Sequence, residues 1–308
     1  MNKYKNIPQS SDWSSIEPLN KGWSKDLKYI VTDKDQRKFI LRISDISLYE
    51  KREKQFSLLN MLEPFNINCP KPISFGKLND NQIYMLITYL EGVPASKYVR
   101  TISDKESYRL GIEAGKILKV IHSLSNNAIK DYPKQTWYER YLEKIDKKIS
   151  AITSSDYKFD NWQFICNFIK ENTHLVKDRP YVFTHGDYHL GNMIVNNGHI
   201  GIIDFDKCVY ADPYDEFKCF CWNVFENPYF ESGLINEYFN YNVPSDFFKI
   251  LKLYAAESLI SHLPWATTFG EKEINTAYKV IDSVMKWYDN FTLDIPLWYK
   301  KIFKNIKN

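Results

Sequence analysis

The sequence predicts an α+β fold, in which a small antiparallel sheet with one helix precedes a larger, mainly helical part. Short β-branched and aromatic runs, separated by turn residues, fill the first ninety residues. Long amphipathic helical segments follow Gly92-Val93-Pro94. The chain has 308 residues, 44% of them hydrophobic, and single cores stop growing at roughly 250 to 300 residues. We therefore expect two lobes.

Two hairpins and one helix are expected in the first lobe. Asp33-Lys34-Asp35-Gln36 and Asn79-Asp80-Asn81 each separate two apolar runs, which is typical of a hairpin. Between the hairpins, residues 46–62 carry apolar side chains at steps of three and four, and Pro64 ends this pattern. The expected strands span residues 28–32, 38–43, 73–78 and 83–90.

The second lobe is expected to be helical. Ser103 and Glu106 have the spacing of a capping box, and an apolar stripe follows them. We place the boundary near residue 92, so that residues 1–92 form the N-lobe with its hinge and residues 93–308 form the helical C-lobe. Further helices are expected at about 136–150, 157–172, 245–262 and 272–289.

Composition excludes several classes of protein. The net charge of +3 is too small to indicate a nucleic-acid partner. No run approaches the roughly 18 apolar residues that a membrane span needs. The N-terminus lacks the apolar stretch of a secretory signal, and the five cysteines include no CxxC pair. We therefore expect a cytoplasmic protein with no membrane partner.

One short hairpin inside the second lobe brings two oxygen ligands together. Asn197-Gly198 between apolar runs predicts a type I′ turn, in which Asn196 pairs with His199. Counting back along this register places Asn192 and Asp204 at the same open end. Because neighbouring strands lie about 4.8 Å apart, both side chains can hold one divalent cation. Mg²⁺ prefers such oxygen ligands and takes further ligands from water and phosphate.

A third side chain belongs to the same end of the hairpin. Asp187 lies five residues before Asn192, in the loop that enters the hairpin. It can accept a hydroxyl proton while the metal ion neutralises charge on the phosphate. The spacing of Asp187, Asn192 and Asp204-Phe205 is that of the kinase catalytic and metal-binding segments. This pattern predicts phosphoryl transfer, whereas the histidines lack the spacing of a metallohydrolase.

His185-Gly186-Asp187 through Asn192, followed by Ile203-Asp204-Phe205-Asp206, make the chain resemble the aminoglycoside phosphotransferase family, which has a protein-kinase-like fold. The resemblance covers most of the chain. It implies that Asp187 is the catalytic base, that Asn192 and Asp204 bind Mg²⁺, and that ATP or GTP is the co-substrate.

The resemblance also implies a nucleotide site in the N-lobe. Ser24, in a loop with a single glycine, would contact phosphate, and the backbone around Tyr89 and Leu90 would hydrogen-bond the purine. Arg42 stands where the family has a lysine on the third strand, and Glu53 would orient it. Arginine forks onto phosphate well but is not interchangeable with lysine. A nucleotide-binding module without phosphotransfer is therefore a second hypothesis.

The acceptor is predicted from charge. Residues 187–257 contain eleven acidic residues and four lysines, and an acidic surface favours capture of a cationic acceptor. This observation and the resemblance point to an aminoglycoside. The alternatives are a macrolide, a choline-like alcohol or a sugar, and also a metal-dependent phosphohydrolase that needs no acceptor. Acids that only solvate helix faces would explain the same count.

Overall fold

The computed structural model describes residues 4–19, 25–124 and 133–299. The chain divides into two compact units, one formed by residues 1–93 with 193–206 and one by residues 94–192 with 207–308. The segment 193–206 therefore groups with the N-terminal unit, although the sequence analysis assigned it to the C-lobe. None of the described helices combines the length and the apolar character needed to cross a membrane.

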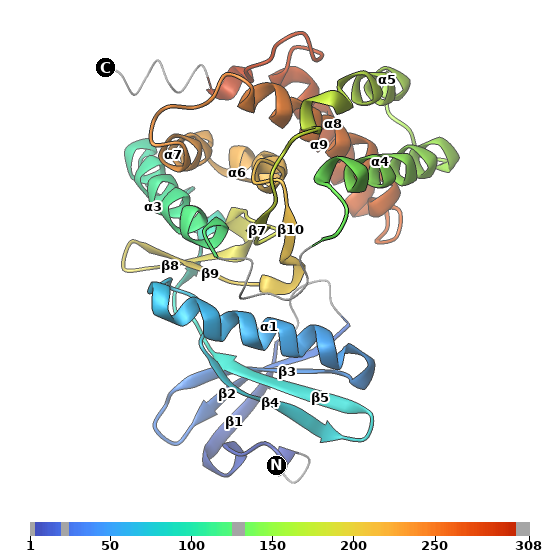
Figure 1. The fold of residues 1–308 in the computed structure, drawn as a ribbon. Helices are drawn as coiled ribbons and strands as arrows, with labels where there is room; N and C mark the ends of the chain where they lie inside the picture. The colour runs from blue at the N-terminus through green and yellow to red at the C-terminus, as the bar shows by residue number, and fades with distance from the viewer. Residues whose placement is uncertain (1–3, 20–24, 125–132, 300–308) are drawn as a thin grey trace. The chain divides into compact units, whose positions relative to one another are not determined.

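An antiparallel sheet with the strand order β1-β2-β3-β5-β4 forms the first unit (Figure 1). Both predicted hairpins are confirmed, with Lys28 opposite Arg42 in one and Gly76 opposite Tyr84 in the other. The sequence analysis did not predict β1. The strands are β1 (Trp13–Pro18), β2 (Leu27–Asp33), β3 (Lys38–Asp45), β4 (Pro72–Asn79) and β5 (Gln82–Thr88).

The predicted helix is confirmed as α1 (Tyr49–Leu62), which follows a short 3-10 turn and lies along one side of the sheet (Figure 1). Successive side chains of a strand point to opposite faces of the sheet, so the side chains of β3 contact different residues on the two faces. Leu41 and Ile43 belong to the hydrophobic core on one face of the sheet. Arg42 and Ser44 alternate with them, and their side chains contact α1.

The hairpin of β8 (Met193–Asn196) and β9 (His199–Ile202) has the predicted register, with Asn196 opposite His199. Asn197 and Gly198 have φ values of 50° and 75°, as a type I′ turn requires. At Gly92, whose φ is 138°, a Cβ atom would lie 2.4 Å from the backbone oxygen of Val195. Glycine is therefore required where the end of the first segment approaches this hairpin.

The second unit is mainly helical, and both Ser103 of α3 and Thr136 of α4 form capping boxes. Every predicted helix is present, although α5 begins later than expected. The helices are α2 (Ala95–Tyr98), α3 (Asp104–His122), α4 (Trp137–Ser154), α5 (Trp162–Asn172), α6 (Phe220–Glu226), α7 (Pro228–Tyr238), α8 (Phe247–Ala266) and α9 (Glu271–Trp287). The short strands are β6 (Val93–Pro94), β7 (Val182–Thr184) and β10 (Val209–Ala211).

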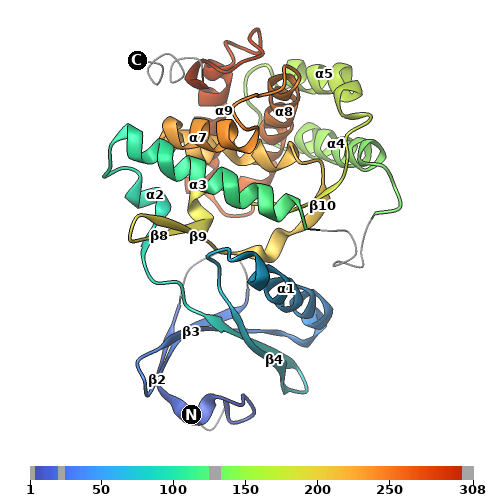
Figure 2. The same cartoon turned by 60° about the vertical axis from the view of Figure 1, so that its left-hand side comes forward.

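The sequence analysis missed α2, α6 and α7. Helix α7 is buried on almost all sides between Phe230 and Asn236, so it shows no amphipathic stripe. It packs beside α3 (Figure 2) with the two backbones nearly in contact. A Cβ atom on Gly111 of α3 would lie 2.0 Å from the backbone oxygen of Phe230, and one on Gly233 would lie 2.2 Å from that of Tyr108.

Candidate active site

The loop after β7 places a carboxylate and an amide side by side. The Asn192 side chain donates a hydrogen bond of 3.0 Å from Nδ2 to Oδ2 of Asp187 and a second bond of 3.0 Å to the Asp187 backbone oxygen. Lys207 Nζ lies 3.0 Å from Asp187 Oδ2, and His189 Nε2 lies 3.6 Å from Oδ1. The structure thus brings Asp187 and Asn192 together within the second unit.

Opposing effects act on the pKa of Asp187. Burial raises the pKa, but the neighbouring His189 and Lys207 together lower it by more. The pKa of this carboxyl therefore lies well below its usual range. The Asp187 side chain is 18% exposed, so it is ionised, hydrogen-bonded and still open to solvent. An ionised carboxylate in this state can accept a proton from a hydroxyl group placed beside it.

The oxygen donors expected for a metal ion fit Mg²⁺. Because Nδ2 of Asn192 donates both bonds to Asp187, the amide oxygen is the atom left for a cation. Asp204, in the first unit, is exposed in the left-handed region with φ of 66°, and its side chain forms no hydrogen bond or ion pair with any described residue. The described residues contain no cluster of three or more His, Cys, Asp or Glu side chains able to hold a metal ion. An amide oxygen and a carboxylate are ligands of the kind that Mg²⁺ accepts, with water and phosphate as further ligands.

A buried glutamate holds the loop that carries Asp187. Glu216 accepts hydrogen bonds from the backbone N–H groups of His185 (2.6 Å) and Gly186 (2.8 Å). Burial raises the pKa of Glu216, but hydrogen bonding to His122 and its charge lower it more, and the net pKa is below the ordinary value. The sequence analysis did not identify Glu216 as a site residue. No sequence pattern around it, shortly after Asp212-Pro213-Tyr214, indicates that its side chain accepts hydrogen bonds from backbone N–H groups.

The same loop is fixed at two further points. Gly186 has a φ of 80°, and a Cβ atom there would lie 2.2 Å from the backbone oxygen of Lys207, so glycine is required. The backbone N–H of Leu190 donates to Asn223 Oδ1 at 2.8 Å, and Asn223 Nδ2 donates to Glu231 Oε2 at 2.7 Å. Burial raises the pKa of Glu231 to about 7, although the hydrogen bond from Asn223 opposes the shift.

Replacing Glu231 with glutamine is expected to remove a loss of stability at high pH. The folded state favours protonated Glu231, so this group's stabilising contribution is complete below the ordinary pKa of a glutamate and is lost as pH rises through about 7. At pH 8 the variant should have a free energy of unfolding higher by about 2 to 3 kcal/mol. Denaturant unfolding at pH 5 and pH 8 measures this. The difference in unfolding free energy between variant and parent should be larger at pH 8 than at pH 5. An equal or smaller difference at pH 8 would contradict the prediction.

The predicted phosphate-binding cation lies in a cluster of charged groups. Arg42 Nε lies 3.0 Å from Asp26 Oδ2, and Arg42 Nη1 lies 2.6 Å from Asp206 Oδ1. Gln55 of α1 also accepts from Arg42 at 3.4 Å. The expectation that Glu53 orients Arg42 is wrong for this structure, because Glu53 is exposed on α1 and makes none of these contacts.

The other predicted nucleotide contacts are the backbone at Tyr89 and Leu90 and the side chain of Ser24. Tyr89 and Leu90, the predicted hinge residues, directly follow β5 and are half-buried. The backbone N–H of Tyr89 donates to the Lys38 oxygen at 3.1 Å, so a purine contact from Tyr89 would use its carbonyl group. Ser24 lies outside the described residues.

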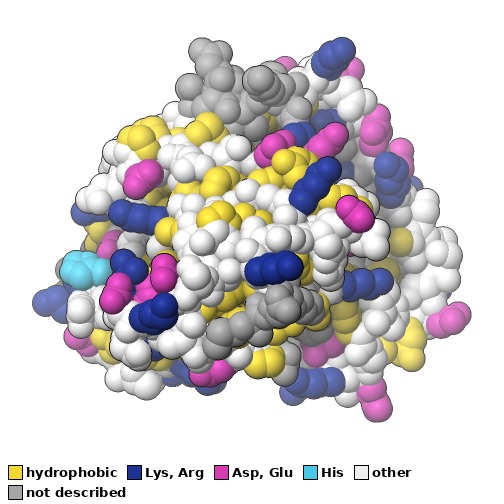
Figure 3. Space-filling view, turned by 90° about the horizontal axis from the view of Figure 1, so that it is seen from below, with side chains coloured by type: hydrophobic (Ala, Val, Ile, Leu, Met, Phe, Trp, Pro, Cys, Tyr) yellow, Lys and Arg dark blue, Asp and Glu magenta, His cyan; other side chains and the backbone are white. Residues whose placement is uncertain are grey.

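Acidic residues of the predicted acceptor side are mostly neutralised within the protein. Acidic and basic side chains are interspersed on the face of the molecule that Figure 3 shows from below, a view that does not single out residues 187–257. The cations that pair with the acids come largely from outside residues 187–257, so counting charges along that window overstates its acidity. The pairs are Asp187 with Lys207, Asp206 with Arg42, Asp212 with Arg179, Asp215 with Lys144 and Lys218, Glu226 with Arg100, Glu237 with Lys119, and Glu257 with Lys144 and Lys148.

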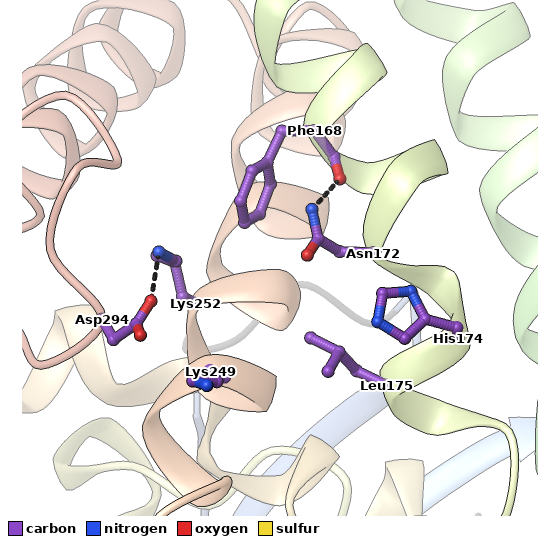
Figure 4. A pocket seen from close by; sticks show the side chains of 7 residues that line it. All are labelled: Phe168, Asn172, His174, Leu175, Lys249, Lys252 and Asp294. Carbon is purple, nitrogen blue, oxygen red and sulfur yellow. Dashed lines mark hydrogen bonds and ion pairs between the residues drawn. The ribbon is translucent and has the colours of Figure 1, made fainter.

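A cavity of about 280 Å³ lies in the second unit. Figure 4 shows the Lys252 side chain paired with Asp294 on one side of it, and Asn172 hydrogen-bonded to the Phe168 backbone on another. None of the predicted site residues lines this cavity. It is therefore separate from the candidate site.

Three features define the class of protein as a kinase-like phosphotransferase. They are the sheet with one helix along it, the helical unit, and the loop in which an asparagine is hydrogen-bonded to an ionised aspartate. The chain belongs to the phosphotransferase enzyme family known as APH, whose model matches residues 15–243. This confirms the family resemblance and the predicted fold class. No curated protein is significantly similar in sequence.

Solved structures share this fold at low identity. The GDP complex of wild-type aminoglycoside 2'-phosphotransferase-IIIa is 14% identical, covers 91% of this chain and 95% of its own, and has a TM-score of 0.73. ADP-bound aminoglycoside phosphotransferase APH(2'')-Ib is 16% identical, covers 97% and 98%, and has a TM-score of 0.66. A thermostable form of APH(4)-Ia with ADP and hygromycin B is 15% identical, covers 92% and 97%, and has a TM-score of 0.67.

Proposed function

We propose that the protein transfers the γ-phosphoryl group of ATP or GTP to a hydroxyl group of a small molecule. The observation that carries this proposal is the ionised, partly exposed carboxylate of Asp187, hydrogen-bonded to Asn192 in a chain of the phosphotransferase enzyme family. The relatives with GDP or ADP bound support a nucleoside triphosphate as co-substrate.

In this proposal Asp187 positions the acceptor hydroxyl and takes its proton. The hydroxyl oxygen forms a bond to the γ-phosphorus, the bond from that phosphorus to the bridging oxygen breaks, and the nucleoside diphosphate leaves. Asn192 and Asp204 would hold Mg²⁺, which neutralises phosphate charge when bound. Arg42 would contact phosphate oxygens, and positioning with electrostatics would supply most of the rate enhancement.

Contacts to the nucleotide would come from the first unit. Ser24 would donate to a phosphate, and the backbone at Tyr89 and Leu90 would hydrogen-bond the purine. The half-buried hinge after β5 supports the second assignment, since a base bound there is partly removed from water.

An aminoglycoside is the first candidate acceptor, supported by relatives whose structures contain one, such as APH(4)-Ia with hygromycin B. A second candidate is an acceptor with little positive charge, such as a macrolide or a sugar. The ion pairs that neutralise acids such as Asp215 and Glu257 favour it, because paired carboxylates attract a polycation weakly.

A screen of aminoglycosides, macrolides, choline-like alcohols and sugars with ATP and with GTP tests the function. Phosphorylated product, detected by mass spectrometry in one acceptor class, is expected. Turnover with a macrolide or a sugar but with no aminoglycoside would reject the first acceptor. Nucleotide binding with no product in any class would favour the non-catalytic module, and phosphate release without an acceptor would favour a phosphohydrolase.

A further inference from the structure

Four charged side chains of the first unit form one buried cluster. Arg52 of α1 contacts the same two carboxylates as Arg42 of β3. Its Nη2 lies 2.5 Å from Asp26 Oδ2, and its Nη1 lies 3.0 Å from Asp206 Oδ1. The side chains of Arg42, Arg52 and Asp26 are 8%, 4% and 5% exposed, and that of Asp206 is 17% exposed. Two guanidinium groups this close would repel each other, so the carboxylates between them keep the cluster together.

The hydrogen-bonding groups of the two arginines are used differently. Arg52 uses all three nitrogens, because Nε donates to Ser44 at 3.2 Å and Nη1 also donates to Gln55 at 2.9 Å. Arg42 contacts the cluster through Nε and Nη1, and its Nη2 forms no hydrogen bond with a described residue. Arg52 therefore holds its neighbours with every nitrogen, whereas Arg42 has in Nη2 a donor group that none of the described residues uses.

We propose that Arg52 is a positioning residue for phosphoryl transfer, holding Asp26 and Asp206 so that these carboxylates orient Arg42. This inference rests on the proposed function. In this arrangement Asp26 and Asp206 orient Arg42, the role that the sequence analysis expected of Glu53. A cluster of two cations and two carboxylates thus replaces the expected pair of one cation and one carboxylate.

The cluster also includes a residue of the turn that follows the predicted metal ligand. Asp206 belongs to the 3-10 turn Phe205–Lys207, which directly follows Asp204. Oδ1 of Asp206 lies 2.6 Å from Arg42 Nη1 and 3.0 Å from Arg52 Nη1, so a single carboxylate oxygen joins the two guanidinium groups. Without Arg52, two carboxylates would face one guanidinium group, and the net negative charge would oppose the binding of nucleotide phosphates.

Arg52→Met, measured with the full chain, tests this role. ADP affinity by calorimetry and the KM for nucleotide should each weaken by about tenfold, while the KM for the acceptor changes less than twofold. Arg52→Lys keeps the charge but loses the fork, so its ADP affinity should lie between those of the parent and Arg52→Met. Lys51→Met removes a charge from an exposed neighbour on α1 and should leave ADP affinity unchanged.

The double variant Arg52→Met/Asp26→Asn restores charge balance and should regain ADP affinity to within about threefold of the parent. Thermal unfolding shows which variants are folded. If Arg52→Met does not fold, the ADP affinity of Arg52→Lys tests the proposal instead. Parent-like ADP affinity in a folded Arg52 variant would overturn the proposal, as would a double variant weaker than the single one. ADP binding that weakens as expected, in a chain without transfer to any acceptor, would support the cluster and reject the proposed function.

Discussion

Replacing Asp187 with asparagine is expected to lower kcat for phosphoryl transfer by about three orders of magnitude, since a general base contributes roughly 10² to 10⁴. The amide cannot take the hydroxyl proton, and it can no longer form an ion pair with Lys207. ADP affinity should change little, because the phosphate-binding groups proposed in the first unit are untouched. Single-turnover transfer and ADP titration measure the two quantities separately.

A matched control and the pH profile sharpen this prediction. Asp160→Asn replaces an exposed aspartate and should retain parental kcat. His189 and Lys207 outweigh burial and keep the pKa of Asp187 well below its usual range. The carboxylate is therefore ionised at every pH above the usual pKa range of an aspartate. Activity should therefore show no loss from this group between about pH 5 and pH 8. An Asp187→Asn variant with more than a tenth of parental kcat would contradict the assignment of the base.

Two features of the candidate site follow from local sequence alone. The Asn197-Gly198 turn fixes the register of β8 and β9, because only residues that tolerate positive φ form this turn. The five-residue step from Asp187 to Asn192 spans a short loop that closes on itself through the hydrogen bond between the two side chains. Both depend on contacts within a few residues, which a sequence pattern specifies.

The partners of Arg42 did not follow from sequence. Arg52 and Glu53 are adjacent on α1, and a helix turns by 100° per residue, so only one of them can face the sheet. The buried stripe of α1 runs through Arg52 and Gln55, and hydrophobicity does not reveal a buried stripe that begins with polar residues. Asp26 and Asp206 reach the cluster from distant parts of the chain, and no local pattern connects them with Arg42.

The predicted acidic acceptor surface had a similar weakness. A count of charges along residues 187–257 treats each carboxylate as exposed, but charge is neutralised in space rather than in sequence. Lys144 and Lys148 of α4 reach Glu257 of α8, whose side chain is 1% exposed. The count was correct, and the inference to a cationic acceptor was weakened by tertiary pairing.

Replacing Glu216 with glutamine is expected to lower the free energy of unfolding by about 3 to 5 kcal/mol, the usual cost of removing one partner from a buried charged group. Glutamine keeps one acceptor oxygen, but its NH₂ group would face an N–H of His185 or Gly186, which leaves a buried donor unsatisfied. The loop that carries Asp187 would loosen together with the loss of stability. Urea unfolding at pH 7 measures the free energy.

Glu226→Gln provides the comparison for this variant. Glu226 pairs with Arg100, whose side chain is 64% exposed, and such pairs contribute only about 0 to 1 kcal/mol. The two variants make the same chemical change, so a difference in their unfolding free energies reports the buried hydrogen bonds to backbone. If Glu216→Gln were as mild as Glu226→Gln, the backbone at His185 and Gly186 would be held by other contacts. Glu216 would then have no part in placing the carboxylate of Asp187, the proposed catalytic base.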